Sequence, residues 1–182
     1  MKKLIIVLVV IVVMAGFITR SSAQVTINPT AGAELVQVLT ITNSTPLYFG
    51  RICITAGTAG TVIMGTNGVR TPGTGTTVII NTGITPRTVA QFDLTGSTDV
   101  VYTISIPSPI VVTTTSGTGV KSMNIDALKV KVGNASEVDA AGATGTFVSG
   151  ASSFLMSGTL NIVATQAIGI YAGTYPVTVD FQ

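Results

Sequence analysis

The chain has 182 residues, a length that suits one domain with a hydrophobic core. Charged residues make up only 9% of it, against about 25% in typical soluble proteins, and 46% of its residues are hydrophobic. This balance excludes a disordered chain, and the abundant Thr, Ser, Gly and Asn predict a β protein with a hydroxyl-rich surface.

The first 23 residues have the layout of a bacterial secretory signal peptide. Two lysines are followed by an apolar run over 4–18 and by the small residues Ser21, Ser22 and Ala23. The run is shorter than the about 20 residues that cross a bilayer. We therefore expect cleavage between Ala23 and Gln24 and export to the periplasm, the cell surface or the medium. The alternative is an uncleaved N-terminal anchor.

Cleavage also changes the charge of the chain. The signal holds Lys2, Lys3 and Arg20, so the nine Lys and Arg fall to six, against seven Asp and Glu, a net charge of −1. The net charge of +2 therefore belongs to the precursor. Because no basic patch remains, we expect no nucleic acid partner and no membrane contact after the signal is removed.

Residues 24–33 form a short arm ahead of the first long strand. Val25 and Ile27 alternate with Thr26 and Asn28, which is the period of an extended strand. We expect this arm to add as a strand to a neighbouring subunit, or else to fray or to join its own sheet.

The remaining residues, 34–182, are predicted to form a single domain of short strands closed by Gly, Pro, Asn or Ser. Strands are expected at 34–42, 47–54, 61–65, 68–71, 77–80, 89–94, 99–106, 110–115, 122–132, 154–164 and 173–181. A turn is expected at 43–46, a type I′ hairpin turn at Asn67-Gly68, and a polar connector at 134–143. A turn every 8–12 residues predicts an all-β, immunoglobulin-like or fimbrial-type antiparallel β-sandwich. A closed barrel is the alternative.

The residue types needed for common catalytic and metal sites are missing. The chain has no His and one Cys, which excludes Ser-His-Asp and Cys-His sites. It also argues against a zinc site, because zinc ligands in proteins are mostly Cys and His. We therefore predict no catalytic residue, no cofactor and no metal. Cys53 lies in an Ile-Cys-Ile run and is predicted to be a small core residue.

The last predicted strand is the most informative segment. Tyr175, Val177, Val179 and Phe181 alternate with polar residues and Pro176, so they share one face. Soluble proteins protect an edge strand with charges, but here only Asp180 and Pro176 could do so. This edge is expected to be covered or used for pairing.

Four motifs together resemble the bacterial family catalogued as domain of unknown function 4402. They are Leu-Tyr-Phe-Gly at 47–50, Ala-Gln-Phe-Asp-Leu-Thr-Gly at 90–96, Val-Tyr-Thr-Ile-Ser-Ile-Pro at 101–107 and Gly-Thr-Tyr-Pro-Val-Thr-Val-Asp-Phe at 173–181. The resemblance covers most of 34–182. It implies an exported, β-rich protein, and no enzymatic activity comes with it.

A looser similarity is to the subunits of chaperone–usher pili. Those subunits end in an alternating apolar strand with an aromatic second-last residue, here Phe181, and carry a Gly at the place of Gly169. This chain departs from them in lacking their disulfide and in its short arm. The similarity implies partners that are further copies or other surface subunits, and a periplasmic chaperone.

Together these observations predict a structural or adhesive protein of the bacterial cell surface. We expect it to be fimbrial-like and to assemble through β-strand complementation. The alternative is a monomeric surface module that binds, for example, glycans. With four Tyr and no Trp, stacking surfaces for sugars are scarce.

Overall fold

The structure is a computed structural model that describes residues 24–75, 78–80 and 86–182. The chain divides into two units, 1–34 and 35–182, which are described separately. In the first unit, residues 24–34 carry no regular secondary structure. Among the described residues there is no helix, and therefore none that could span a membrane.

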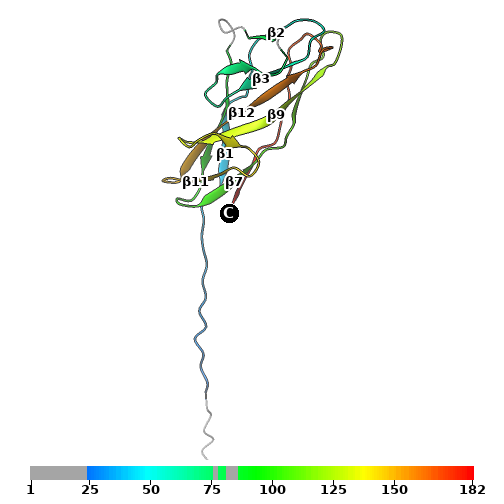
Figure 1. The fold of residues 1–182 in the computed structure, drawn as a ribbon. Coiled ribbons are helices and arrows are strands. Elements are labelled where there is room, and N and C mark those ends of the chain that lie inside the picture. The colour runs from blue at the N-terminus through cyan, green and yellow to red at the C-terminus, as the bar shows by residue number, and fades with distance from the viewer. Residues whose placement is uncertain (1–23, 76–77, 81–85) are drawn as a thin grey trace, which may run out of the picture. The chain divides into compact units, whose positions relative to one another are not determined.

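The second unit is built from antiparallel strands, with the long strand β12 (Ala151–Ile162) at its centre. One edge of β12 pairs with β6 (Ala90–Thr95) and then β3 (Gly60–Met64), and its other edge pairs with β9 (Ser122–Val132). Each neighbour carries a further strand (Figure 1). These outer strands are β1 (Thr40–Thr45) on β6, β4 (Arg70–Pro72) on β3, and β8 (Ile110–Thr113) and β10 (Val138–Asp139) on β9.

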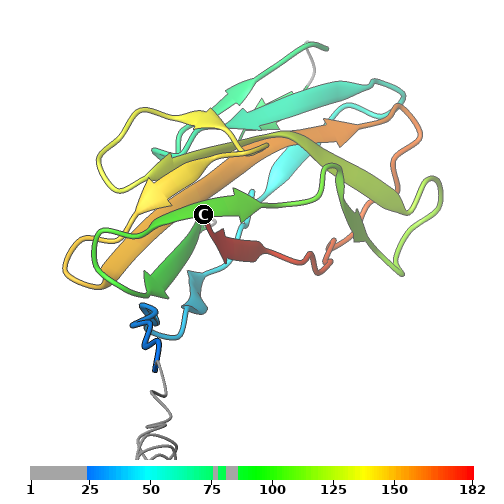
Figure 2. The ribbon, with the colours of Figure 1, turned by 90° about the horizontal axis from the view of Figure 1, so that it is seen from below.

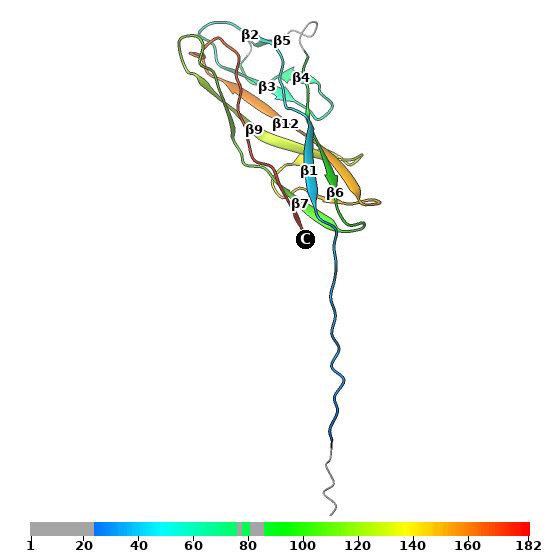
Figure 3. The same cartoon turned by 180° about the vertical axis from the view of Figure 1, so that it is seen from behind.

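A smaller sheet packs on this large one and completes the sandwich. It has the order β11 (Thr144–Thr146), β7 (Val101–Ser105) and β13 (Thr178–Phe181). In Figure 2, β7 and the red β13 lie on one side of β12 and β9. A separate pair, β2 (Ile52–Ile54) and β5 (Val78–Ile80), lies at one end of the domain, and β7 lies at the other (Figure 3). The predicted all-β antiparallel sandwich is confirmed.

The core fills the space between the two sheets, as the alternating patterns predicted. Ala90, Phe92 and Leu94 of β6 are buried, and so are Tyr102 and Ile104 of β7. Aromatic rings meet there: Phe92 stacks on Phe154 at 4.8 Å, and Tyr102 lies 4.8 Å from Phe147. The Tyr102 hydroxyl reaches across to the Ser152 hydroxyl at 2.6 Å and links the two sheets.

The hairpin between β3 and β4 differs from the prediction of a type I′ turn. The backbone N–H of Gly68 donates to the Gly65 carbonyl at 2.9 Å, and Gly68 has φ of 74°. A type I′ turn requires a positive φ at both central residues, and the φ of Asn67 is not positive. The loop is therefore a three-residue connection with only Gly68 left-handed.

Several strand boundaries also differ, because a ladder needs a partner as well as an alternating sequence. The first strand runs over Thr40–Thr45 rather than 34–42, since its partner β6 ends at Thr95, and it continues through the expected turn at 43–46. The 47–54 strand is reduced to β2, and the 173–181 strand to β13. The 134–143 connector holds β10, and β12 begins at Ala151 instead of 154. Thr77 of the expected 77–80 strand lies outside the described residues.

Candidate functional site

An apolar cavity of about 750 Å³ lies beside β2. We call it the β2 pocket. One wall is the segment 47–54, the other wall is the segment 166–171, and the floor comes from β8, β9 and β12. Its size falls within the range of about 300–1,000 Å³ that is usual for ligand sites. The floor residues are Val112, Met123, Leu160 and Ile162.

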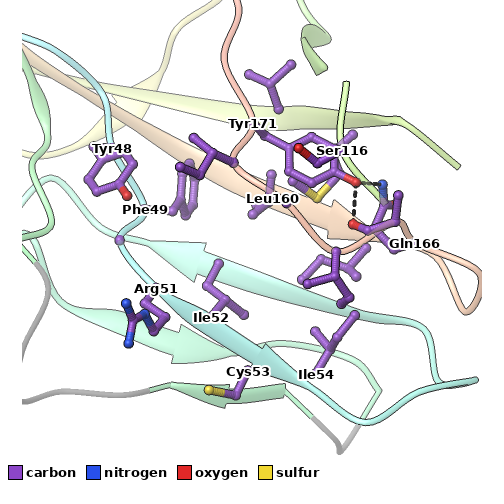
Figure 4. A pocket seen from close by; sticks show the side chains of 18 of the residues that line it. Tyr48, Phe49, Arg51, Ile52, Cys53, Ile54, Ser116, Leu160, Gln166 and Tyr171 are labelled. Atoms are coloured by element: carbon purple, nitrogen blue, oxygen red, sulfur yellow. Dashed lines mark hydrogen bonds between the residues drawn. The ribbon is translucent and has the colours of Figure 1, made fainter. Parts of the chain in front are cut away.

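The 47–54 wall owes its form to strand alternation. Ile52 and Ile54 point into the pocket, and Cys53 between them points away (Figure 4). Cys53 is therefore an exposed free thiol, and the prediction that it is a core residue was wrong. The two isoleucines take the inward positions of the strand, so the residue between them must face outward.

A buried arginine holds the start of this wall. The Arg70 guanidinium donates hydrogen bonds to the Phe49 carbonyl and, at 3.1 Å, to the Arg51 carbonyl. Burial, and then the nearby Arg87 charge, lower the pKa of Arg70. Gly50 lies between the two bonded carbonyls with φ of 72°, a left-handed conformation that interrupts the predicted strand.

The 166–171 wall is fixed by a polar network. The Gln166 amide donates to the Val120 carbonyl at 2.7 Å. It also donates to the Tyr171 hydroxyl at 2.7 Å (Figure 4). The Tyr171 hydroxyl donates to the Ala167 carbonyl at 2.6 Å. Between them, a Cβ on Gly169 would lie 2.6 Å from the Thr114 hydroxyl oxygen, so a larger residue here would have to displace the Thr114 side chain.

Large apolar side chains remain exposed at the rim of the β2 pocket. Ile168 is 71% exposed, Ile170 is 84% exposed and Tyr48 is 44% exposed. Arg51 is the one charged residue of the lining. The arrangement is suited to holding apolar groups, and no cluster of metal-ligating side chains occurs in the part of the chain that the structure describes.

The structure distributes the predicted strand-pairing residues over three places. Gly169 lines the β2 pocket. Val179 is buried, and Tyr175, Val177 and Phe181 pack against the core, so these four share one face as predicted. β13 pairs with β7 in register Val179 to Ile104. Val25 and Ile27 lie in the separately described 24–34 segment, where both are exposed. Of the predicted cleavage site, Gln24 is described and Ala23 lies outside the described residues.

Apart from Gly169, sequence reasoning missed the residues of both walls of the β2 pocket as a site. The signal that could have revealed one of them is the pair Ile168 and Ile170, which alternate outside any predicted strand. Two large apolar residues in a stretch with no assigned core role suggest a surface that is buried by something else.

Comparison with known proteins gives one match. No curated protein and no solved structure matched the chain. One family model does match, described as Domain of unknown function (DUF4402), and it covers residues 39–181, which include every strand of the sandwich. The chain therefore belongs to the domain of unknown function 4402 family.

Proposed function

We propose that the mature chain is an exported structural or adhesive subunit of the bacterial cell surface, of a fimbrial-like kind, that assembles through β-strand complementation. The observation that carries this proposal is the β2 pocket, an apolar cavity whose rim leaves Ile168 and Ile170 exposed. An isolated soluble domain has no reason to leave such side chains in water beside a hollow that they could help to fill.

The open edges of the sandwich support the same proposal. Among the described residues, β13 is paired on one side only, with β7, and its own sequence offers Asp180 as the single charge. An unprotected edge with free N–H and C=O groups favours pairing with another chain. Further copies, other surface subunits and a periplasmic chaperone are the proposed partners.

Export is the second part of the proposal and rests on the sequence of residues 1–23. Intact mass measurement of the protein recovered from the periplasm or medium of an expressing bacterium tests it. We expect a chain that starts at Gln24. A chain that retains residues 1–23 and stays in the cytoplasmic fraction would contradict export.

Assembly is tested on the purified mature chain, 24–182. Light scattering coupled to size exclusion, over a hundredfold range of concentration, should give species that grow with concentration, and electron microscopy should give filaments. A particle of constant monomeric mass over this range, with no filaments on expressing cells, would remove the proposal.

A glycan-binding module is the alternative function. The observation in its favour is that Tyr48 and Tyr171 line the β2 pocket and offer aromatic surface there. This function predicts binding on a glycan array by a monomer, and loss of that binding in Tyr48→Ala. An array without hits would remove the glycan-binding alternative, and the assembly proposal would then be the one that stands.

A further inference from the structure

The segment 25–35 has the sequence of a strand but forms none in this chain. Apolar residues occupy every odd position, while the even positions hold Thr26, Asn28, Thr30, Gly32 and Glu34. The odd positions are Val25, Ile27, Pro29, Ala31, Ala33 and Leu35. Val25 is 86% exposed, Ile27 is 78% exposed and Leu35 is 94% exposed. A one-sided apolar strand of this kind is stable only against an apolar surface.

The β2 pocket has the complementary need. Within the described residues, no backbone hydrogen bond joins the 47–54 wall to the 166–171 wall. The base of this space includes Leu160 and Ile162, which are already buried, and its rim carries Ile168 and Ile170, which are 71% and 84% exposed. An extended segment with one apolar face could cover these rim side chains and offer backbone groups to a wall at the same time.

Charge favours this match. No side chain of residues 24–33 is charged, although cleavage before Gln24 would place an α-amino group just ahead of the segment. Glu34 is the only ionisable side chain of the segment 25–35, and Arg51 is the only charged residue in the lining of the β2 pocket. Burial of the segment would therefore desolvate very few charged groups. Pro29 lacks an N–H, but successive residues direct their N–H groups to opposite edges, so only one edge of the segment loses a donor.

The chain enters the sandwich at the end opposite to the β2 pocket. Thr40 pairs with Thr95, and Thr95 pairs with Ala151 at the start of β12. The pocket instead contains Leu160 and Ile162, at the other end of β12. The backbone N–H of Gln37, just before β1, is bonded to the Ser97 hydroxyl at 2.5 Å, also at the entry end.

We propose that residues 25–35 of one copy insert as an extended strand into the β2 pocket of a second copy, with their odd-numbered side chains on the pocket floor. This inference rests on the proposed function and names its donor and acceptor. Because the donor leaves one end of the domain and the acceptor opens at the other, the contact is heterologous and joins copies head to tail into an open filament. The same segment of the own chain would have to reverse direction between residue 35 and β1 to reach the pocket.

The donor is tested by two variants of the mature chain that add equal charge. Ile27→Asp/Leu35→Asp places two carboxylates on the apolar face, and the control Thr26→Asp/Thr30→Asp places two on the polar face. We expect the first to raise the concentration of half-assembly at least about tenfold, and the control to change it less than about threefold. Equal effects of the two variants would overturn the proposal.

The acceptor is tested by a pair matched in exposure. Ile168, at the pocket rim, is 71% exposed, and Val148, outside the pocket lining, is 73% exposed. Ile168→Asp should weaken assembly at least about tenfold and Val148→Asp should not, while both keep the thermal unfolding of the parent because neither side chain is buried. Assembly that survives Ile168→Asp and Ile170→Asp together would exclude this pocket as the acceptor.

The single thiol provides a geometric test. Cys53 faces outward from β2, on the side where the polar face of an inserted strand would lie. Under mild oxidation, at least one of Thr26→Cys, Asn28→Cys and Thr30→Cys should form disulfide-linked dimers and longer chains on a non-reducing gel, in excess of the parent and of Ile27→Cys. Exclusively intramolecular disulfides would overturn the second copy as the occupant.

The failure of this inference can be told apart from failure of the proposed function. Filaments that form equally well in the Ile27→Asp/Leu35→Asp and Ile168→Asp variants would leave the surface subunit in place and remove this contact. A parent chain that is monomeric at every concentration and gives no intermolecular disulfide would remove both.

Discussion

At the residue scale, glycines opposite aromatic rings control how closely the small sheet packs. Gly145 of β11 is the cross-strand partner of Tyr102, and a Cβ at Gly145 would lie 2.3 Å from the Tyr102 hydroxyl oxygen. A Cβ at Gly96 would likewise lie 2.8 Å from the ring of Phe147. These rings are buried because the facing positions have no side chain.

Gly145→Ala should therefore destabilise the fold by about 1–3 kcal/mol, because the added methyl must displace a buried ring. Urea unfolding followed by circular dichroism measures the loss. Gly32→Ala, at a glycine with no atom within 4 Å of the added Cβ, is the control and should leave the unfolding curve unchanged. Equal stability of the Gly145 variant and the parent would contradict the packing described for Tyr102.

Tyr175 makes the stability of the fold depend on alkaline pH. Burial raises the pKa of Tyr175 to about 12, from an ordinary value of 10.0. A folded-state pKa above the unfolded one stabilises the fold fully below pH 10, and this contribution is lost as the pH rises from about 10 to 12.

The free energy of unfolding should fall over this pH window, by about 1–2 kcal/mol from Tyr175 once solvent screening of this partly exposed side chain is allowed for. In Tyr175→Phe the fall should be smaller but still present, because burial also raises the pKa of Tyr102 despite its hydrogen bond to Ser152. Denaturant midpoints measured at several pH values between 8 and 12 test this. An identical pH dependence in parent and variant would contradict it.

At the element scale, β12 organises the sandwich because it contacts both its neighbours in the large sheet and the small sheet. It pairs with β6, β3 and β9 in its own sheet, and its Ser152 hydroxyl bonds the Tyr102 hydroxyl of the small sheet at 2.6 Å. Tyr102 is fully buried, so its hydroxyl depends on Ser152 for a hydrogen bond.

Ser152→Ala should lower the free energy of unfolding by about 1–3 kcal/mol, since it leaves the buried Tyr102 hydroxyl without that bond. Tyr102→Phe combined with Ser152→Ala should recover part of the loss, because no polar group is then left unpaired. Chemical denaturation of the two single variants and the double variant forms the cycle that tests this. Strictly additive losses would show that the two hydroxyls are not coupled.

Strand prediction succeeded best where a strand has partners on both edges. β9 was predicted over 122–132 and found over Ser122–Val132, although its alternation breaks between Ile125 and Leu128, where Ala127 has φ of 44°. The first and last strands were predicted to begin too early, since 34–39 and 173–177 are rich in apolar residues but lie beyond the ends of β6 and β7. A sequence pattern defines the faces of a strand, whereas the partner decides its length.

At the scale of the whole molecule, the core is contained within 35–182. The residues that pack in it range from Leu39 to Phe181. The segment 24–34 contributes no member of this core among the described residues. The sandwich should thus be stable without the segment that we propose as donor.

Deletion of 24–34 from the mature chain should change the unfolding temperature by less than about 2 °C at a concentration where the parent is monomeric. Deletion of 178–182 is the control and should lower it far more, because β13 then no longer covers β7. Thermal circular dichroism measures both. A large loss of stability on removing 24–34 would mean that this segment belongs to the fold of its own chain.

The sequence alone determined the features that depend on local pattern. Alternation identified the β class and the shared face of Tyr175, Val177, Val179 and Phe181, because each depends only on a period of two. Composition alone also established the lack of His.

Only the tertiary structure decided where the sandwich is incomplete. The β2 pocket joins 47–54 to 166–171, two segments far apart in the chain, and the direction of Cys53 follows from which neighbours of β2 face the core. A one-residue change in register reverses every side chain of a strand, and register is fixed by distant partners. The pairing of distant edges therefore determines which apolar residues become core and which remain exposed at an open site.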